Sequence, residues 1–451
     1  MTSSPIVDAE TQVVVDWLTK NVGGKVTSIA RQPRWRPQWI ADVERDGELI
    51  PLMVRGERYD MVLTWSLDHE MRFQKVMADV GVNVPKVWGW LDEPKAFVMD
   101  RVPGQSDFKD TSDADRDRVV DEYLQQLAIL HTADLAPFVA AGIDRADSPE
   151  ESAMLGIRRL NHVYRTQKVG SDPQMEFFLA WMERHPPRSH GREGAVVWDS
   201  GQLMHKDGHL TSVIDVELGH IGDPMMDLAA WRMRDSIVPF GHFASLYERY
   251  GQLVGEPVDL EAIELHHIYF TLSNQLGFSH ARQNPPVNSD FATNMQWCNE
   301  TNLYATEALA EFLDIDLPTV DTPDDYDSTA SAAAEHLVRT LSTIRVDDEY
   351  ARYKLRGAFR MARHLQRHDQ IGRQLLEADL DDVHQLIGRR IDDWREADRA
   401  LEEWVIVNNA DGHLDATLCQ FFHKRNLRAQ MLNGPVGSAM ARHIPIQSFR
   451  S

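Results

Sequence analysis

Hydrophobic and polar positions change their rhythm several times within the first hundred residues. Apolar residues recur at helical spacing over residues 8–20, with a candidate cap at Asp8 or Thr11. The apolar positions on one side of this predicted helix are Val13, Val14, Trp17 and Leu18. The pattern then predicts short strands at residues 26–32, 39–47 and 48–56, with a tight turn at Asp46-Gly47.

Helical patterns dominate the remainder of the chain. A helix is expected from about Leu67 to Val80, after which residues 81–104 have the pattern of two strands joined by an Asp-Glu-Pro turn. From Asp113 onward the spacing is helical, apart from strand-like pieces around residues 195–215. A small sheet followed by a larger helical region predicts an α+β protein with two lobes and a cleft between them.

Length and composition indicate a globular protein with two or three packed units. The chain has 451 residues, of which 43% are hydrophobic and 26% are charged. No apolar run is long enough to cross a membrane, and residues 1–12 lack a basic and then apolar signal region, so we expect a cytoplasmic protein without a membrane partner. Two cysteines, Cys298 and Cys419, are too few for a disulfide framework and are expected to be buried small hydrophobes.

The net charge of −23 opposes nonspecific binding to nucleic acid, because phosphates would be repelled over most of the surface. Residues 421–451 differ from the rest of the chain, since they contain no acidic residue and several basic ones. The basic residues are Lys424, Arg425, Arg428, Arg442 and Arg450. Either this segment docks on the acidic body or on a partner subunit, or it is an anion-binding arm for a nucleotide or a phosphate-bearing substrate.

Two short pieces within residues 196–229 hold the candidate chemistry: WDSGQLM and VIDVELGHIGDPMMDLA. Three earlier pieces accompany them in the order PLMVRGE, HEMRFQKVMADVGVNVPKVWGW and FVMDRVPG. Over roughly residues 25–320, the chain resembles the aminoglycoside phosphotransferase and choline kinase-like family, a branch of the protein-kinase-like fold. The resemblance implies a small N-lobe with an antiparallel sheet, a larger mainly helical C-lobe, and phosphoryl transfer that uses ATP and Mg²⁺.

The resemblance assigns three residues to phosphoryl transfer, which requires positioned phosphates and neutralised charge. Asp215 matches the family's metal-binding aspartate, and Gln202, thirteen positions earlier, stands where the family has an Asn as second metal ligand. Asp199 would accept or orient the proton of a substrate hydroxyl. The loop from Asp199 to Gln202 is two residues shorter than the family pattern, and Gly201 is expected to permit the tighter turn. Alternatively, Asp199 and Asp215 are turn residues of an inactive site.

Further site residues are implied in the N-lobe. Arg55 stands where protein kinases carry a lysine and would hold phosphates, with Glu70 as its partner; otherwise the two form an ordinary surface salt bridge. Backbone groups near Asp100 and Val102 would meet the adenine ring. Trp198, in place of the family's His or Gly, would narrow the site or wall off an aromatic or acyl substrate.

The glycine-containing loop that the family has between its first two strands is missing. The interval ARQPRWRPQWIADV contains no glycine whose backbone could approach phosphates closely. It carries instead Arg31, Arg34, Trp35, Arg36 and Trp39. Either arginine side chains replace the backbone cradle, or these residues form a lid over an aromatic or acyl ligand.

The piece GHIGDPMMDLA is interpreted as mainly structural. Asp223 before Pro224 has the form of a helix N-cap with proline at the first helical position. Asp227 either hydrogen-bonds back to the catalytic loop, as the resemblance implies, or is a solvated helical residue. We expect His220 to be a satisfied histidine rather than a ligand, and Glu217 to approach the metal through a water.

Three parts are predicted along the chain: an N-lobe at residues 1–103, a helical C-lobe with the catalytic and metal-binding loops at 104–325, and a helical extension at 326–451. The extension contains an apolar helical stripe over residues 383–401, and we expect it to pack on the C-lobe or to form a homodimer. The piece VNNADGHLDATL is not a calcium loop, because Val407 and Leu418 stand where carboxylate ligands are required.

Two functions from different classes remain open. The first is an ATP- and Mg²⁺-dependent kinase for a small-molecule hydroxyl, which the presence of both Asp199 and Asp215 favours. The second is a pseudokinase that binds a nucleotide or metabolite, or an interaction scaffold, which the missing glycine loop favours. The acceptor is not specified, although the tryptophans of the first loop and the basic end favour an acyl or aromatic alcohol.

Overall fold

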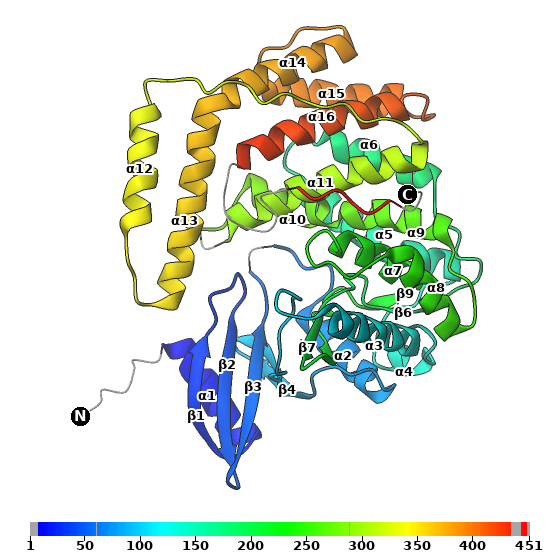
Figure 1. The fold of residues 1–451 in the computed structure, drawn as a ribbon, viewed down its shortest axis with the longest axis vertical. Coiled ribbons are helices and arrows are strands. Elements are labelled where there is room, and N and C mark those ends of the chain that lie inside the picture. The colour runs from blue at the N-terminus through cyan, green and yellow to red at the C-terminus, as the bar shows by residue number, and fades with distance from the viewer. Residues whose placement is uncertain (1–7, 60, 288, 434–442, 449–451) are drawn as a thin grey trace. The chain divides into compact units, whose positions relative to one another are not determined.

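The structure is a computed structural model that describes residues 8–59, 61–287, 289–433 and 443–448. The chain divides into two units. Unit 1 comprises Met1–Gly156, Ser189–Trp231 and Val238–Val258, and unit 2 comprises Ile157–Arg188, Arg232–Ile237 and Asp259–Ser451. An antiparallel sheet forms early in the chain and helices form most of the rest, which confirms the predicted α+β class (Figure 1).

Unit 1 holds the strands of the described residues together with several helices. In chain order its elements are α1 (Ala9–Asn21), β1 (Lys25–Arg31), β2 (Gln38–Arg45), β3 (Glu48–Gly56), α2 (Leu67–Asp79), β4 (Val87–Asp92), β5 (Lys95–Asp100), α3 (Asp113–His131), α4 (Ala136–Ala140), β6 (Gly194–Val196), β7 (Leu203–Lys206), β8 (His209–Val213), β9 (His220–Gly222) and α8 (Phe243–Val254). Helices α5 (Pro149–Gln167) and α7 (Met225–Arg234) each contain a point where the chain passes from one unit to the other. The strands and helices predicted in the first hundred residues are confirmed close to their expected bounds.

The main sheet of unit 1 is antiparallel throughout, with the strand order β1-β2-β3-β5-β4. The turn between β2 and β3 lies at Asp46 and Gly47, as predicted. Both residues have positive φ, 55° and 83°, which two-residue hairpin turns require because their twist then matches that of the strands. The register that follows from this turn pairs Gln38 with Arg55.

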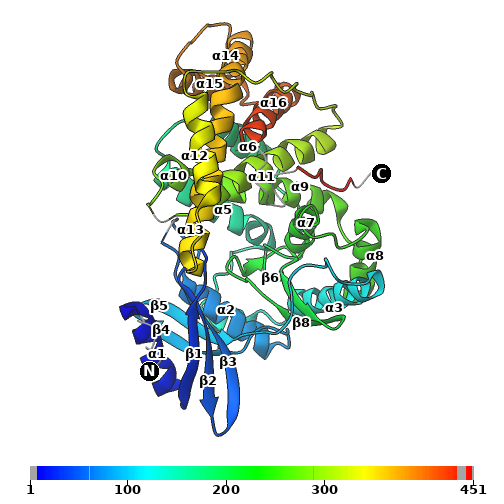
Figure 2. The same cartoon turned by 60° about the vertical axis from the view of Figure 1, so that its left-hand side comes forward.

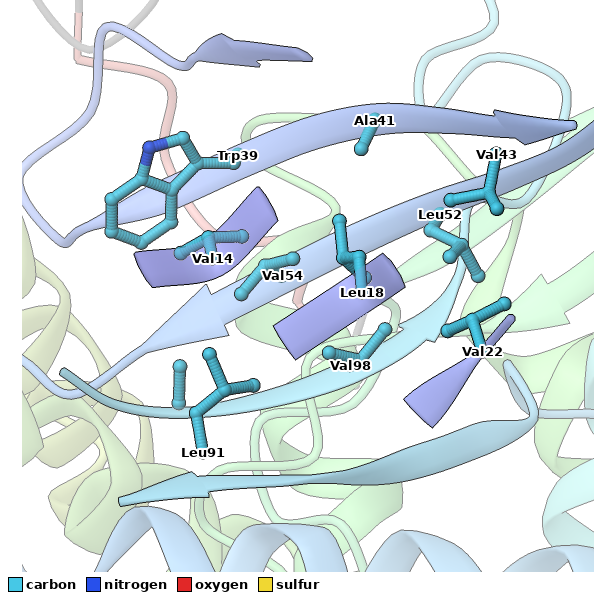
Figure 3. Packing of buried hydrophobic residues seen from close by; sticks show 11 residues of the cluster. Val14, Leu18, Val22, Trp39, Ala41, Val43, Leu52, Val54, Leu91 and Val98 are labelled. Atoms are coloured by element: carbon cyan, nitrogen blue, oxygen red, sulfur yellow. The ribbon is translucent and has the colours of Figure 1, made fainter. Parts of the chain in front are cut away.

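Side chains along each strand point alternately to the two faces of the sheet, and both faces are covered by a buried cluster. Leu52 and Val54 of β3 pack in the cluster that contains Val14, Leu18 and Val22 at α1 (Figure 3). The intervening Met53 packs instead in the cluster formed with Leu67 and Met71 of α2. Because side chains point to opposite faces in turn, Arg55 follows Met53 onto the α2 side of the sheet.

Helix α1 differs in detail from its prediction. Asp8 is the N-cap, since its side chain accepts from the backbone N–H of Thr11, and Thr11 is therefore the capped residue. Val13 is 44% exposed, so the predicted apolar side is narrower than expected. The Thr11 hydroxyl accepts a hydrogen bond of 2.9 Å from the indole N–H of buried Trp39, which ties α1 to β2.

Unit 2 is helical. Besides the ends of α5 and α7, it contains α6 (Pro173–Arg184), α9 (Leu260–Thr271), α10 (Ser273–Gln283), α11 (Phe291–Leu313), α12 (Ser331–Thr343), α13 (Glu349–Arg367), a π-helical segment η1 (His368–Gly372), α14 (Arg373–Ile387), α15 (Trp394–Asn408) and α16 (Asp415–Asn433). Helices α12 and α13 lie side by side as an antiparallel pair (Figure 1, Figure 2). Helix α11 packs along α16, and both cysteines, Cys298 and Cys419, are buried there as expected.

The basic residues of α16 dock on acidic helices of the same unit. The ion pairs join Lys424 to Asp382, Arg425 to Asp379 and Asp398, and Arg428 to Asp379 and Asp382, with N···O distances of 2.6–3.0 Å. These carboxylates belong to α14 and α15. Docking on the acidic body is therefore confirmed for these three residues, whereas Arg442 and Arg450 lie outside the described residues.

No helix within the described ranges combines the length and the apolar character that a membrane crossing requires. The three-part division at residues 103 and 325, the cytoplasmic location and the homodimer formed by residues 326–451 stay predictions.

Candidate active site

Strand β3 and helix α2 bring together the predicted pair Arg55 and Glu70. The Nε of Arg55 lies 2.7 Å from Oε1 of Glu70, and the two side chains are only 8% and 4% exposed. Helix α2 turns Glu70 toward the sheet together with Leu67 and Met71, because residues three and four apart share one helical face. An ordinary surface salt bridge is therefore the wrong interpretation of this pair.

The pair is part of a larger ion cluster, which consists of Arg36, Arg55, Glu70, Asp215 and Glu217. Arg55 also contacts Asp215 and lies 3.5 Å from Glu217. Arg36 contacts Glu217 and lies 3.8 Å from Glu70. The arginines and Glu70 are almost fully buried, whereas the side chains of Asp215 and Glu217 are 24% and 29% exposed. A ligand that approaches from solvent therefore meets carboxylate oxygens first.

Burial and charge act in opposite directions on the two carboxylates that contact Arg55. Burial raises the pKa of Glu70 to about 7, and the nearby Arg55 and Arg36 only partly oppose this effect. Burial also acts to raise the pKa of Asp215, but Arg55 and Arg36 outweigh it and lower this pKa to about 2. Asp215 is therefore ionised at neutral pH, as a metal ligand must be.

The hairpin β7–β8 places Gln202 beside Asp215. Leu203 is paired with Val213, and the carbonyl oxygen of Gln202 accepts a hydrogen bond of 3.1 Å from the backbone N–H of Ile214. Gln202 and Asp215 are thirteen positions apart in sequence, but the hairpin folds the chain back on itself. The two candidate metal ligands therefore lie at the same end of the hairpin. Asp215 follows with a φ of 58°, in the left-handed region that few non-glycine residues adopt.

The shortened loop keeps Asp199 in contact with Gln202. The side-chain amide of Gln202 donates a hydrogen bond of 2.8 Å to Oδ2 of Asp199. Gly201 has a φ of 82°, and its N–H donates to the hydroxyl of Tyr123 at 2.6 Å. The predicted role of Gly201 in the tight turn agrees with this conformation, because glycine adopts positive φ without steric cost.

Asp227 supports this loop from helix α7. Its carboxylate is fully buried and accepts from the backbone N–H groups of Val197 at 3.0 Å and Trp198 at 2.6 Å. The imidazole of His131 contacts the same carboxylate at 2.9 Å. The alternative of a solvated Asp227 is wrong. The predicted cap at Asp223 is confirmed, since Met225 donates its N–H to the Asp223 side chain.

Trp198 belongs to the interior of unit 1 and does not line a substrate surface. Its ring is 1% exposed and packs edge-on against Trp65 and His220, with centroid distances of 6.3 Å and 5.4 Å. A Cβ atom at Gly156 would lie 2.7 Å from this ring, so the packing requires a glycine there. The expectation that Trp198 walls off a substrate is therefore corrected. His220 is structural as expected, with Nδ1 2.8 Å from the Leu218 carbonyl oxygen.

The residues of the loop that lacks glycine have separate roles. Trp39 lies in the buried cluster at α1 and cannot form a lid, which corrects that expectation. Arg31 contacts Glu10 of α1. Arg36 forms ion pairs with Glu70 and Glu217 of the cluster, and the charge of Arg34 helps to lower the pKa of Asp215.

The predicted adenine-binding residues lie at the end of β5. The backbone N–H of Asp100 donates to the carbonyl oxygen of Lys86 at 2.9 Å, and its side chain accepts from Trp88 at 2.7 Å. Val102 follows in the half-buried segment after the strand. The role of both residues in binding adenine stays a prediction.

The oxygen donors fit a magnesium ion. Mg²⁺ binds through one or two carboxylates and retains several waters. The ionised Asp215 offers such a carboxylate, and the backbone hydrogen bond from Ile214 holds Gln202 at the same end of the hairpin. A closed cage of three or more His, Cys, Asp or Glu side chains is absent from the described part of the chain. Glu217 contacts Arg36 and lies 3.5 Å from Arg55, and its expected approach to the metal through a water stays a prediction.

Sequence reasoning missed two contacts of the site. The first is the ion pair of Arg36 with Glu217, whose two residues are 181 positions apart. No local pattern indicated this contact, because Arg36 lies in the bend before β2 and outside its paired residues. The second is the contact of 2.7 Å between His69 Nε2 and the Gly219 carbonyl oxygen, which joins α2 to the loop after Asp215.

Comparison with known proteins identifies the region that contains most of this site. Residues 63–265 match a family model described as a phosphotransferase enzyme family. The matched range includes Glu70, Asp199, Gln202 and Asp215, and it confirms the resemblance to aminoglycoside phosphotransferases.

A curated relative from Mus musculus, acyl-CoA dehydrogenase family member 10, is 26% identical over 178 residues, which are 36% of this chain and 16% of that protein. A solved Ralstonia eutropha JMP134 protein, assigned as an aminoglycoside phosphotransferase, is 19% identical with a TM-score of 0.49, over 64% of this chain and 94% of that one. A macrolide 2′-phosphotransferase from Brachybacterium faecium is 16% identical with a TM-score of 0.44, over 61% and 94% of the two chains.

Proposed function

We propose that this chain, whose residues 63–265 match the model of the phosphotransferase enzyme family, transfers the γ-phosphate of ATP to a hydroxyl group of a small molecule. The contact between Arg55 and Asp215 carries this proposal. The two residues are 160 positions apart, and they are the expected phosphate-binding cation and the expected metal ligand. Their meeting in one buried cluster supports a site for a metal–phosphate complex.

Each residue then has a defined task. Asp199, held by Gln202, accepts or orients the proton of the acceptor hydroxyl as its oxygen attacks phosphorus. Asp215 and Gln202 hold Mg²⁺, which when bound neutralises charge on the phosphate oxygens. Arg55 exchanges a carboxylate oxygen for phosphate oxygens, and Glu70 keeps the guanidinium oriented during this exchange.

A pseudokinase is the second candidate, and the interval ARQPRWRPQWIADV without glycine favours it. Such a protein would bind a nucleotide without transferring phosphate. We propose no particular class of acceptor alcohol. Two observations remove much of the support for an acyl or aromatic alcohol. Burial takes away the surface role of Trp39 and Trp198, and aspartates pair with Lys424, Arg425 and Arg428.

Nucleotide titration tests the proposal. We expect ATP with Mg²⁺ at about one hundred times its Kd to stabilise the protein by about 2.7 kcal/mol, visible as a higher Tm. Slow ATP turnover should rise with a suitable member of a panel of alcohols. Asp215→Asn should weaken the stabilisation, and Asp199→Asn should retain it while turnover falls.

Asp121→Asn is the matched control, since Asp121 forms a surface pair with Arg249 in the same unit. It should change neither measurement. Absence of stabilisation at millimolar ATP would contradict the kinase and a nucleotide-binding pseudokinase, and would leave a metabolite-binding protein or an interaction scaffold. Stabilisation without turnover on any alcohol would favour the nucleotide-binding pseudokinase.

A further inference from the structure

The loop between β1 and β2 directs one arginine into the ion cluster at the position where the family has its glycine-containing loop. Arg36 is 4% exposed, and its guanidinium contacts Glu217 and lies 3.8 Å from Glu70. It comes two residues before Gln38, which is paired with Arg55. Arg36 and Arg55 share two carboxylates, since each guanidinium lies 3.8 Å or less from both Glu70 and Glu217.

Trp35 fixes the loop that carries Arg36. The guanidinium of Arg34 lies 5.4 Å from the Trp35 ring centroid, and that of Arg58, after β3, lies 5.7 Å from it. Contacts of this kind contribute about 0.5–1 kcal/mol each at partly exposed sites. Trp35 therefore joins the loop to the segment after β3, and the neighbouring Arg36 is held in a defined place.

Arg36 also lines a small cavity. This cavity has a volume of about 40 Å³, and its other walls include Arg58, Glu70 and Glu217 together with apolar side chains such as Trp65 and Leu218. This volume holds about one or two water molecules, so oxygen atoms of that size have room beside Arg36.

Arg36 brings a second guanidinium into the ion cluster, beside that of Arg55. Because nucleotide phosphates are anionic, two cations at this place attract them more strongly than one.

We propose that Arg36 binds the nucleotide's phosphates together with Arg55 and replaces, by a side chain, the backbone cradle of the missing glycine loop. The inference rests on the proposed function, because it assigns a residue to the nucleotide site of that reaction. Arg36 is a binding residue that exchanges Glu217 for phosphate oxygens. The planar fork of arginine suits this exchange, since it can bind two oxygens at once.

Binding measurements with three probes separate the phosphate contact from the rest of the site. ATP, inorganic tripolyphosphate and adenosine are titrated by calorimetry, with Mg²⁺, into the full chain. We expect Arg36→Gln to raise the Kd of ATP and of tripolyphosphate about tenfold or more and to leave that of adenosine unchanged. The Kd values of Arg36→Lys for ATP and tripolyphosphate should lie between those of the wild type and those of Arg36→Gln, because lysine keeps the positive charge but lacks the planar fork of arginine.

Two further variants serve as controls. Arg118→Gln removes an equal charge from a surface pair with Asp115 in the same unit and should leave all three Kd values unchanged. Should Arg36→Gln fold poorly with Glu217 left unpaired, the double variant Arg36→Gln with Glu217→Gln removes both charges, and the same tenfold loss is expected there.

The outcomes distinguish this inference from the proposed function. Unchanged ATP affinity in folded Arg36→Gln overturns the inference, and turnover by the wild type would then still support the phosphotransferase. An equal loss for adenosine also overturns it, since Arg36 would be structural. Phosphate-specific loss without turnover on any alcohol supports the inference and contradicts phosphoryl transfer. Wild type that binds neither ATP nor tripolyphosphate contradicts both.

Discussion

Asp227 offers the sharpest test of how the candidate catalytic loop, residues 197–202, is supported. Its buried carboxylate accepts from the backbone N–H groups of Val197 and Trp198 through different oxygens, and His131 contacts it as well. Asp227→Asn keeps the shape of the side chain. It replaces one acceptor oxygen by an NH₂ group that cannot accept a hydrogen bond.

The cost of this change follows from the contacts. One buried backbone N–H of Val197 or Trp198 is left without its acceptor, at about 1–3 kcal/mol. The remaining contacts lose their ionic character, which costs about 1 kcal/mol each. We therefore expect Asp227→Asn to lower the free energy of unfolding by about 3–5 kcal/mol, the range typical of a broken buried pair.

Urea denaturation measures the total cost, and hydrogen exchange of peptides that cover residues 194–203 locates it. The exchange of the Val197 and Trp198 amides should accelerate more than that of the sheet β1–β5. Asp121→Asn, at a surface pair, should stay within about 1 kcal/mol of the wild type. The reasoning would be refuted if Asp227→Asn lost less than about 1 kcal/mol or left the loop amides equally protected.

Three other changes test separate parts of the site. Glu70→Gln is expected to flatten the pH dependence of stability. Because the pKa of Glu70 rises from 4.5 to about 7 on folding, the folded wild type binds more protons in this window, and its free energy of unfolding should fall by about 2–3 kcal/mol between pH 4.5 and 7 in urea titrations; an equally steep fall in the variant would contradict this assignment. Gln202→Ala should raise the Mg²⁺ concentration needed for half-maximal ATP binding about tenfold, while Gln202→Asn, which keeps an amide oxygen, should raise it less; equal values for both would remove Gln202 from the metal site. Trp198→Ala should lower the free energy of unfolding by about 3–5 kcal/mol because it empties a buried volume, whereas Trp394→Ala, at a position 46% exposed, should change it by less than about 0.5 kcal/mol; similar costs for the two would contradict the placement of Trp198.

The shortened loop that carries the candidate base Asp199 is compatible with the rest of the site. Although two residues shorter than the family pattern, it holds Asp199 and Gln202 in hydrogen-bond contact at 2.8 Å. Tyr123 and Asp227 anchor its backbone at Gly201 and at Trp198. The shortening therefore changes the route of the chain between two anchored ends, and Gln202 keeps its place beside Ile214 and Asp215.

Local sequence patterns were sufficient to predict the helices and strands of the first hundred residues and part of the candidate site. The period of apolar residues and the Asp46-Gly47 turn predicted α1, α2 and the strands of the main sheet, because these signals depend on neighbouring residues only. Spacing and family resemblance selected Asp199, Gln202 and Asp215. The hairpin β7–β8 then brings these residues together by a register that the sequence does not state.

Contacts between distant segments could not be inferred in the same way. Trp39 and Trp198 have the same chemistry as ligand-binding tryptophans, and only their burial shows that they are core residues. The basic residues of α16 left docking on the acidic body and an anion-binding arm both open, until their aspartate partners on α14 and α15 were located. A charged or aromatic side chain acquires its role from what surrounds it, and that surrounding is formed by residues far away in the chain.

The sequence by itself determined which segments become helices and strands, since backbone preference and apolar period are local properties. It also determined which residue types are available for phosphoryl transfer. Only the tertiary structure decided that Arg36, Arg55, Glu70, Asp215 and Glu217 form one ion cluster. The physical reason is that electrostatic energy and pKa depend on distance and burial, and neither is defined until strands, helices and loops have packed together.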